Sequence, residues 1–412
     1  MIFKNKLTFI LIFCLSHTFS GNSQSLEFQW KKNFESEKGN SISAVIEDDA
    51  GHIVFAGETR NEHAQLDLWL LKIDKLGRTI WTKNFPRRGH QRVFSLLKTE
   101  TGFMVGANDI PTRTAARPFV LFVDNDGNAT KKTKIKYKQE LRLKKLKKVG
   151  DDFYGVGITI KPMEDIFTDG ILMKFNKDFD LVSEMNFQPD SVILEHPVTK
   201  LPWNYVSTAE PRDFLVMDDE TLLLTGYQSS EKVTDFWTAN IDFKNKKIRW
   251  ESKINQHFGG NEAFQLIETP DHQPLMIGTR FDIIGEVGTY YGNAIKFDKE
   301  TGKVLFSELY QAKKTNRFDR ILQAFPTKNG CFLVGLSGLD PYRLTKGEVP
   351  QDIWVVFIDH DGKMLWEQTI PQVGEERGVN FLVTAENEYY IFAKAYQKNG
   401  TGDLQVLKIA FP

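Results

Sequence analysis

A small set of histidine, tyrosine and arginine residues has the side chains needed for one kind of chemistry, the eliminative cleavage or dehydration of a uronate-containing sugar. Such a reaction requires a cation that neutralises the carboxylate and a side chain that takes the proton from C5. The cations would be Arg92, Arg320 and Arg377. The candidate catalytic residues that would take the proton are His90, His257, Tyr290 and Tyr291.

Arginines also form the main candidate binding group. When the chain is aligned on a recurrent glycine, the start of the innermost strand of a repeat is occupied by His90, Arg92, Glu262, Arg317, Arg320 and Arg377. Several arginines that converge there would bind a carboxylate or a sulfate bidentately. Alternatively, each arginine pairs with a nearby acid and joins neighbouring repeats. The nearby acids include Glu210, Asp319 and Glu375.

An aromatic insertion is the second candidate binding group. The segment 188–210 is the longest interruption of the repeats and contains Trp203 and Tyr205, and another long connection contains Arg113. Aromatic rings beside polar groups can stack on the apolar face of a sugar ring. The alternative is that Trp203 and Tyr205 only anchor the insertion on the rest of the fold, and both interpretations stay open.

The segment 131–148 is rich in lysine. Lysines alternate along its first part as Lys132, Lys134, Lys136 and Lys138. This alternation is typical of a solvated edge strand that is protected from edge-to-edge pairing. A patch for an anionic polysaccharide or lipid is the alternative interpretation.

The sequence lacks the motifs of several common enzyme classes. It contains no Gly-x-x-x-x-Gly-Lys, His-Glu-x-x-His, Cys-x-x-Cys or Gly-x-Ser-x-Gly motif. The 8 histidines show no ligand spacing, so we expect no cofactor and no metal, although a metal site assembled from distant repeats stays open. The 53 basic and 54 acidic residues nearly balance, which gives no reason to expect a nucleic-acid partner.

The N-terminal segment has the pattern of an export signal. Lys4 and Lys6 precede an apolar run at 7–15, and small or polar residues follow as far as Ser25. We therefore predict a signal peptide at 1–20, with cleavage between 20 and 25, and a secreted or periplasmic protein. No later apolar run is long enough to span a bilayer.

The remaining segment, 26–412, consists of variations on one unit. In 41–85, four apolar runs are separated by turns rich in Gly and Asp, which predicts a four-stranded antiparallel meander. The second run recurs with a small residue, as Gly57, Gly106, Gly157, Gly226, Gly278, Gly335 and Ala393. We therefore predict an all-β, single-domain, seven-bladed β-propeller in which these glycines share one structural position.

The last unit lacks its fourth run, and the N-terminal segment supplies a match for it. Residues 28–34 match residues 80–85 nearly one for one, with Trp30 in the place of Trp81. We predict that the N-terminal strand joins the last blade, so that the ring closes without a free edge.

The repeat resembles a known family. Its features are an apolar-Gly second strand, an Asp-x-Trp third strand such as 67–69, an Asp-x-x-Gly turn such as 74–77, and a fourth strand with Trp. This pattern resembles the secreted β-propeller repeats common in Bacteroidetes-type bacteria and is similar to quinoprotein-like and delta-60 propeller repeats. The resemblance implies the fold and the exported location, and it assigns no catalytic residue.

These observations favour a binding function on one face. In a propeller, the long connections gather on the same face, and long loops on a rigid scaffold commonly carry binding residues. The leading hypothesis is a monomeric binding protein for an acidic oligo- or polysaccharide or a similar extended polar ligand. The alternatives are a lyase or dehydratase that acts on uronate-containing oligosaccharides at the same face, and a protein-interaction scaffold.

Overall fold

The computed structural model describes most of the chain. The described residues are 26–34, 39–63, 65–111, 115–160, 168–188, 191–195, 202–206, 208–218, 220–229, 234–254, 259–284, 287–313, 317–339, 351–371, 379–396 and 402–410. Their regular structure is entirely β-strand, so the predicted all-β fold class is confirmed. Within these ranges no helix has the length and apolar character needed to cross a membrane. The predicted signal peptide lies outside the described residues.

Strands β2 to β13 form three four-stranded antiparallel sheets of consecutive strands. The first consists of β2 (Asn40–Glu47), β3 (Ile53–Arg60), β4 (Leu66–Ile73) and β5 (Thr79–Phe85). The second consists of β6 (His90–Thr99), β7 (Gly102–Ile110), β8 (Arg117–Asp124) and β9 (Ala129–Lys134). The third consists of β10 (Glu140–Val149), β11 (Asp152–Ile160), β12 (Thr168–Phe175) and β13 (Leu181–Phe187).

A 12-stranded sheet follows, and it consists of three further groups of four consecutive strands. The first group is β16 (Thr208–Val216), β17 (Thr221–Ser229), β18 (Thr234–Asp242) and β19 (Lys247–Ile254). The second is β20 (Gly259–Glu268), β21 (Pro274–Ile284), β22 (Val287–Phe297) and β23 (Val304–Tyr310). The third is β24 (Arg317–Thr327), β25 (Gly330–Leu339), β26 (Gln351–Ile358) and β27 (Met364–Ile370). Single parallel residue pairs, Thr234 with Gly260 and Tyr290 with Phe318, link the groups.

The two ends of the chain meet in one more four-stranded sheet. It contains β28 (Val379–Val383), β29 (Tyr389–Tyr396) and β30 (Gly402–Ala410), and β1 (Glu27–Phe34) pairs antiparallel with β30. The register runs from Glu27 opposite Ala410 to Phe34 opposite Leu404.

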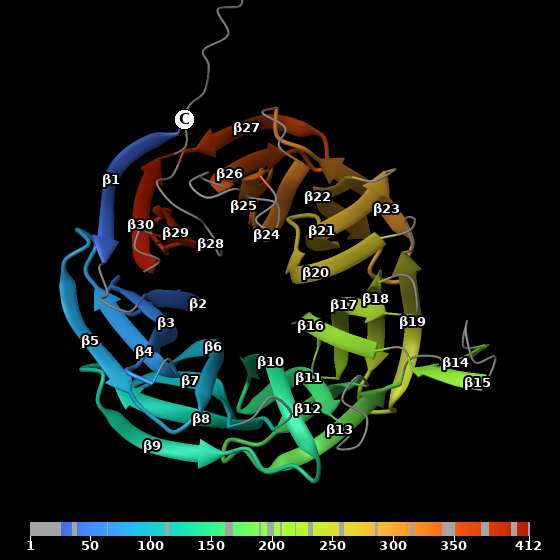
Figure 1. Cartoon of the computed structure of the whole chain (residues 1–412), viewed down its shortest axis with the longest axis horizontal. Coiled ribbons are helices and arrows are strands. Elements are labelled where there is room, and N and C mark those ends of the chain that lie inside the picture. Colours follow the sequence, from blue (N-terminus) through green and yellow to red (C-terminus); the bar gives the residue numbers. More distant parts are fainter. Residues whose placement is uncertain are drawn as a thin grey trace, which may run out of the picture.

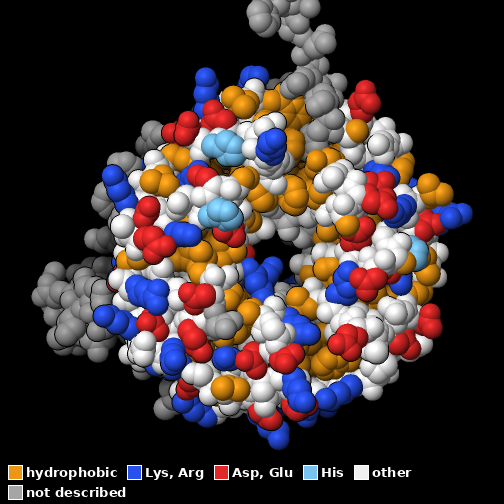
Figure 2. Space-filling view, turned by 180° about the vertical axis from the view of Figure 1, so that it is seen from behind, with side chains coloured by type: hydrophobic (Ala, Val, Ile, Leu, Met, Phe, Trp, Pro, Cys, Tyr) orange, Lys and Arg blue, Asp and Glu red, His pale blue; other side chains and the backbone are white. Residues whose placement is uncertain are grey.

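The groups of four strands are arranged around a central opening, which makes the fold propeller-like (Figure 1). In the six groups from β2 to β27, the first strand lies nearest the centre and the last strand lies at the outside, and in the group that contains β1, β28 lies nearest the centre and β1 at the outside. Figure 2 shows the opening in a space-filling view from behind, with Lys and Arg side chains at its edge.

The hydrophobic core lies between neighbouring groups of strands. Val54 and Leu70 from the first sheet pack in one cluster with Val105 and Phe119 from the second. Because the middle strands are covered on both faces, they are nearly continuous apolar runs, whereas outer strands such as β5 alternate between exposed and half-buried residues.

The insertion predicted at 188–210 contains a β-hairpin. Its strands are β14 (Ser191–Glu195) and β15 (Pro202–Val206), and Leu194 pairs with Trp203. The hairpin lies at the outer edge of the ring, away from the central opening (Figure 1).

Six innermost strands carry a β-bulge, and the bulge explains most of the recurrent glycines. The extra residues are Ser43, Phe94, Lys144, Arg212, Phe264 and Leu322. At Gly57 an added Cβ would lie 1.8 Å from the carbonyl oxygen of Ser41, and the same crowding occurs at Gly157, Gly226, Gly278 and Gly335. The prediction that Gly106 shares this position is wrong, because Ala107 pairs there with Val93 and Gly106 instead faces the ring of Phe94.

Candidate functional site

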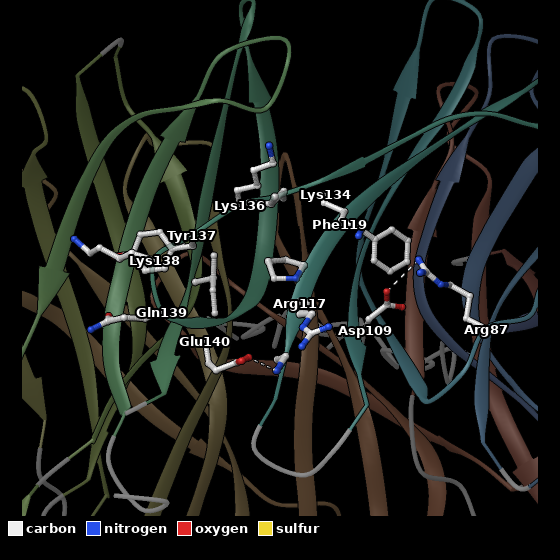
Figure 3. Close-up of a pocket in the computed structure, with 14 residues that line it drawn as sticks. Arg87, Asp109, Arg117, Phe119, Lys134, Lys136, Tyr137, Lys138, Gln139 and Glu140 are labelled. Atoms are coloured by element: carbon white, nitrogen blue, oxygen red, sulfur yellow. Dashed lines mark hydrogen bonds and ion pairs between the residues drawn. The ribbon is translucent and has the colours of Figure 1, made fainter. Parts of the chain in front are cut away.

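A pocket of about 530 Å³ lies between the second and third sheets (Figure 3). Residues from three connections meet there, namely β5–β6, β7–β8 and β9–β10, together with the adjoining strand ends. Its lining is Arg87, Asp109, Ala116, Arg117, Pro118, Phe119, Lys134, Ile135, Lys136, Tyr137, Lys138, Gln139, Glu140 and Leu141.

The pocket carries uncompensated positive charge. Within the described part of the chain, the side chains of Arg117, Lys134 and Lys136 have neither an ion pair nor a hydrogen bond. The remaining charged groups have partners nearby. Arg87 Nη1 lies 3.0 Å from Asp109 Oδ2, Lys138 Nζ lies 2.9 Å from Glu184 Oε1, and Glu140 Oε2 accepts the amide hydrogen of Ala116 at 2.8 Å. The three unpaired cations outnumber the one carboxylate of the lining without an ion pair, that of Glu140, so the pocket would attract an anion.

Aromatic side chains complete the pocket. The ring of Phe119 contacts two cations: the guanidinium carbon of Arg87 lies 5.5 Å from the ring centroid, and Lys132 Nζ lies 3.4 Å from it. Burial, together with the nearby Glu184 carboxylate, raises the pKa of Tyr137 to about 12, so that its phenol stays protonated and can donate a hydrogen bond at neutral pH. A second cavity of about 340 Å³ shares Arg87 and Phe119 with the pocket, which extends the lined surface towards β5.

A second group of charged residues lies on the innermost strands beside the central opening. Glu210 Oε1, on β16, forms ion pairs with Lys144 Nζ of β10 and with Arg212 Nη2, and both distances are 2.8 Å. Arg212 Nη2 also donates to the Tyr227 hydroxyl at 3.4 Å. Burial alone would raise the pKa of Glu210, but the charges of Arg212 and Lys144 outweigh it and lower that pKa.

The same band of charge continues on the next two innermost strands. Arg320 Nη2, on β24, lies 3.2 Å from Glu262 Oε2 on β20. Its guanidinium carbon is 5.1 Å from the ring centroid of Phe264 and 5.8 Å from that of Phe318. For Arg320, therefore, the alternative that it joins neighbouring groups of strands has direct support.

The other predicted site residues lie apart from one another. His90 and Arg92 are exposed at the start of β6, whereas Tyr290 and Tyr291 lie on β22, and Figure 1 places these strands on opposite sides of the opening. The ring centroid of Tyr290 is 4.5 Å from that of Phe281 and 4.6 Å from that of Phe318. Arg113, His257 and Arg377, and the side chains of Trp203, Tyr205 and Arg317, lie outside the described residues.

The lysine-rich segment divides between two structures. Lys132 and Lys134 lie on β9, the edge strand of its sheet, so this part of the prediction is confirmed. Lys136 and Lys138 lie instead in the β9–β10 connection and line the pocket. Sequence reasoning also missed the cations Lys144 and Arg212. Lys144 follows Arg142 by two residues and Arg212 follows Glu210 by two residues, the same alternation of charged residues that the other innermost strands show. Among the described residues, no three His, Cys, Asp or Glu side chains lie together as the ligands of a metal ion would.

Asp319 gives the protein a testable pH dependence. It is fully buried beside Arg320 on β24, and burial raises its pKa to about 6, against hydrogen bonds from Ser337 and the Ala312 amide. The folded state holds this proton more tightly than the unfolded chain does, so protonated Asp319 adds to the free energy of unfolding. This contribution is fully present below about pH 4 and is lost as the pH rises to about 6. We expect the free energy of unfolding of the parent protein to fall by on the order of 2–3 kcal/mol over this range, and Asp319→Asn to abolish this fall. Urea unfolding of both proteins at a series of pH values would measure it, and parallel stability curves would contradict it.

Comparison with protein-family models and with curated proteins finds no match to this chain. Among solved structures, a protein of unknown function from Dyadobacter fermentans DSM 18053 is 10% identical, with a TM-score of 0.48, over 94% of this chain and 99% of that one. A subtype N10 neuraminidase-like protein of A/little yellow-shouldered bat/Guatemala/060/2010 is 8% identical, with a TM-score of 0.41, over 94% of this chain and 100% of that one. Neither likeness bears on the ligand of this protein.

Proposed function

We propose that this protein binds an acidic oligo- or polysaccharide in the pocket between its second and third sheets. The observation that carries the proposal is the group of three uncompensated cations, Arg117, Lys134 and Lys136, around a cavity of about 530 Å³. Uronate or sulfate groups would pair with these cations, and Phe119 and Tyr137 would contact the apolar faces of sugar rings. The neighbouring cavity that shares Phe119 would accommodate further units of an extended ligand.

The scaffold proposed for this site is a secreted or periplasmic seven-bladed propeller, closed by β1. Three features support it. The four-stranded groups succeed one another along the chain, the 12-stranded sheet consists of groups of four, and β1 pairs with β30 at the far end of the sequence. A closed ring would hold the connections around the pocket in fixed positions.

Binding is favoured over catalysis by the chemistry of the pocket. Removal of a C5 proton requires a base, and the raised pKa of Tyr137, about 12, makes its phenolate unfavourable. No histidine occurs among the described residues that line the pocket. A lyase or dehydratase using His90, Tyr290 and Tyr291 remains the second candidate, with Arg92 and Arg320 as possible cations. His90 and Arg92, however, lie in a different sheet from Tyr290, Tyr291 and Arg320.

We expect the triple variant Arg117→Gln, Lys134→Gln, Lys136→Gln to bind oligogalacturonate at least about tenfold more weakly than the parent protein. Each substitution removes a charged contact, which contributes about 1.5–3 kcal/mol when well formed and less than about 1 kcal/mol when exposed. The parent affinity should also fall as salt concentration rises, because the cations are exposed and therefore screened. Isothermal titration calorimetry at two salt concentrations measures both effects.

Lys131→Gln is the matched control. Lys131 is an exposed lysine on β9 that does not line the pocket, so its substitution removes one positive charge, as each of the three pocket substitutions does, while affinity should stay near that of the parent. Equal binding by the parent and the triple variant, or no binding of any acidic glycan by the parent, would refute the proposal.

A further inference from the structure

The innermost strands hold more positive charge than their acids neutralise. Six charged residues of the adjacent strands β10, β16, β20 and β24 interact with one another in a chain, and their four cations and two carboxylates leave an excess of two positive charges within this group. They are Arg142, Lys144, Glu210, Arg212, Glu262 and Arg320. All four cations are half-buried, and the strands that carry them lie beside the central opening. Partly buried charge is costly unless it is paired, so this excess calls for a compensating anion.

Arg142 is the cation that the protein leaves uncompensated. Within the described part of the chain its side chain has neither a hydrogen bond nor an ion pair, and its Nε is buried without a hydrogen-bond partner. Arg142 precedes Lys144, the extra residue of the β10 bulge, by two residues, and it is close enough for its charge to act on the Lys144 ammonium group. Glu210, the acid beside Lys144, already forms ion pairs with both Lys144 and Arg212 through one oxygen atom.

The state of Lys144 also indicates a positive local field. Burial lowers the pKa of its ammonium group, and the pairing with Glu210 opposes that effect. The charges of Arg212 and Arg142 add to the lowering, and the pKa lies below its usual value although Lys144 has an ion-pair partner 2.8 Å away. An anion bound beside Lys144 would reverse this effect, because an opposite charge favours the protonated amine.

We propose that Arg142, Lys144 and Arg212 form a binding site for a compact oxyanion, namely the carboxylate, sulfate or phosphate group of a small molecule. Two guanidinium groups and an ammonium group supply the donors that such a group accepts. The phenol of Tyr227, beside Arg212, adds a hydroxyl group at the same place. This site lies on the innermost strands and does not depend on glycan binding in the pocket.

The experiment measures binding of inorganic sulfate, inorganic phosphate and monomeric galacturonate by calorimetry, with chloride adjusted to keep the ionic strength constant. We expect at least one of the three to bind the parent protein, and the one that binds identifies the chemistry of the group. Arg142→Gln and Lys144→Gln should each weaken that binding by about tenfold or more, as for loss of a charged hydrogen bond. The pocket variant Arg117→Gln removes the same charge and should bind as the parent does.

Thermal melting without added anion separates a ligand site from a structural ion-pair network. Arg142→Gln removes repulsion with Lys144 and breaks no described ion pair, so its melting temperature should equal or exceed that of the parent. The proposal is overturned if the parent binds none of the three anions, or if both Arg142→Gln and Lys144→Gln bind as the parent does. Loss of the small-anion binding in Arg117→Gln would also overturn it, because the anion would then occupy the pocket.

Discussion

Deletion of residues 26–34 should destabilise the protein by about 5 kcal/mol or more, the largest effect that we expect. The deletion removes the whole ladder between β1 and β30. It also removes Leu26, which is 4% exposed and donates its amide hydrogen to Gln368 Oε1 at 2.8 Å. Burial of an apolar side chain stabilises by about 1.5–3 kcal/mol and each hydrogen bond by about 0.5–1.5 kcal/mol. Thermal melting of the truncated protein measures the loss.

Two point variants on β1 act as internal controls for the deletion. The Trp30 ring packs edge-on against Tyr390, with centroids 5.8 Å apart, but it is only half-buried. We therefore expect Trp30→Ala to cost about 2–3 kcal/mol, less than for a fully buried tryptophan. Phe28 is 47% exposed, so Phe28→Ala should change stability by less than about 0.5 kcal/mol. An unchanged melting midpoint in the deletion variant would refute closure of the ring by β1.

Gly278→Val is expected to destabilise by about 3 kcal/mol or more, the second-largest effect. A Cβ at this position would lie 2.2 Å from the carbonyl oxygen of Glu262 and 2.9 Å from the Phe236 ring. The oxygen belongs to the bulged strand β20, and relief of the clash would require that backbone to move, which costs more than the usual 1–3 kcal/mol of overpacking. Denaturant unfolding measures the change.

Gly260→Ala provides the matched control on β20. An added Cβ there would meet no atom within 4 Å, so the substitution should be neutral or should stabilise by up to about 1 kcal/mol. Glycan affinity of folded Gly278→Val should equal that of the parent. A folded Gly278→Val protein that has lost its ligand would show instead that the glycine contributes to binding.

The sequence predicts the strands well because their periodicity is local. Apolar runs and turn residues predict each four-strand unit. Turns such as 74–77 form as expected, with Gly77 at a φ of 72°. The match between 28–34 and 80–85 also predicts the partner of β1, because it compares two copies of the same structural element.

The sequence does not predict the register within the innermost strands. A bulge adds one residue without a distinctive composition, and Ala107 occupies the position predicted for Gly106. The bulges also determine which side chains meet, so the contact of Glu210 with Lys144 and Arg212 cannot be derived by counting from the glycines. The pocket depends on connections from three places in the chain, and no local pattern places Arg117 beside Lys136.

The pairing of β1 with β30 has a consequence for the order of events during biosynthesis. Asn33 and Gln405, whose side chains share a hydrogen bond of 3.2 Å, are 372 residues apart. The ribosome produces β1 among the first strands and its partner among the last, so β1 must wait unpaired while the intervening sheets form. Contacts between such distant segments form slowly, and an unpaired strand edge is prone to aggregation in the meantime. Completion of the last sheet should therefore be a late, post-translational step in folding, and the waiting strand should be the segment most in need of a chaperone.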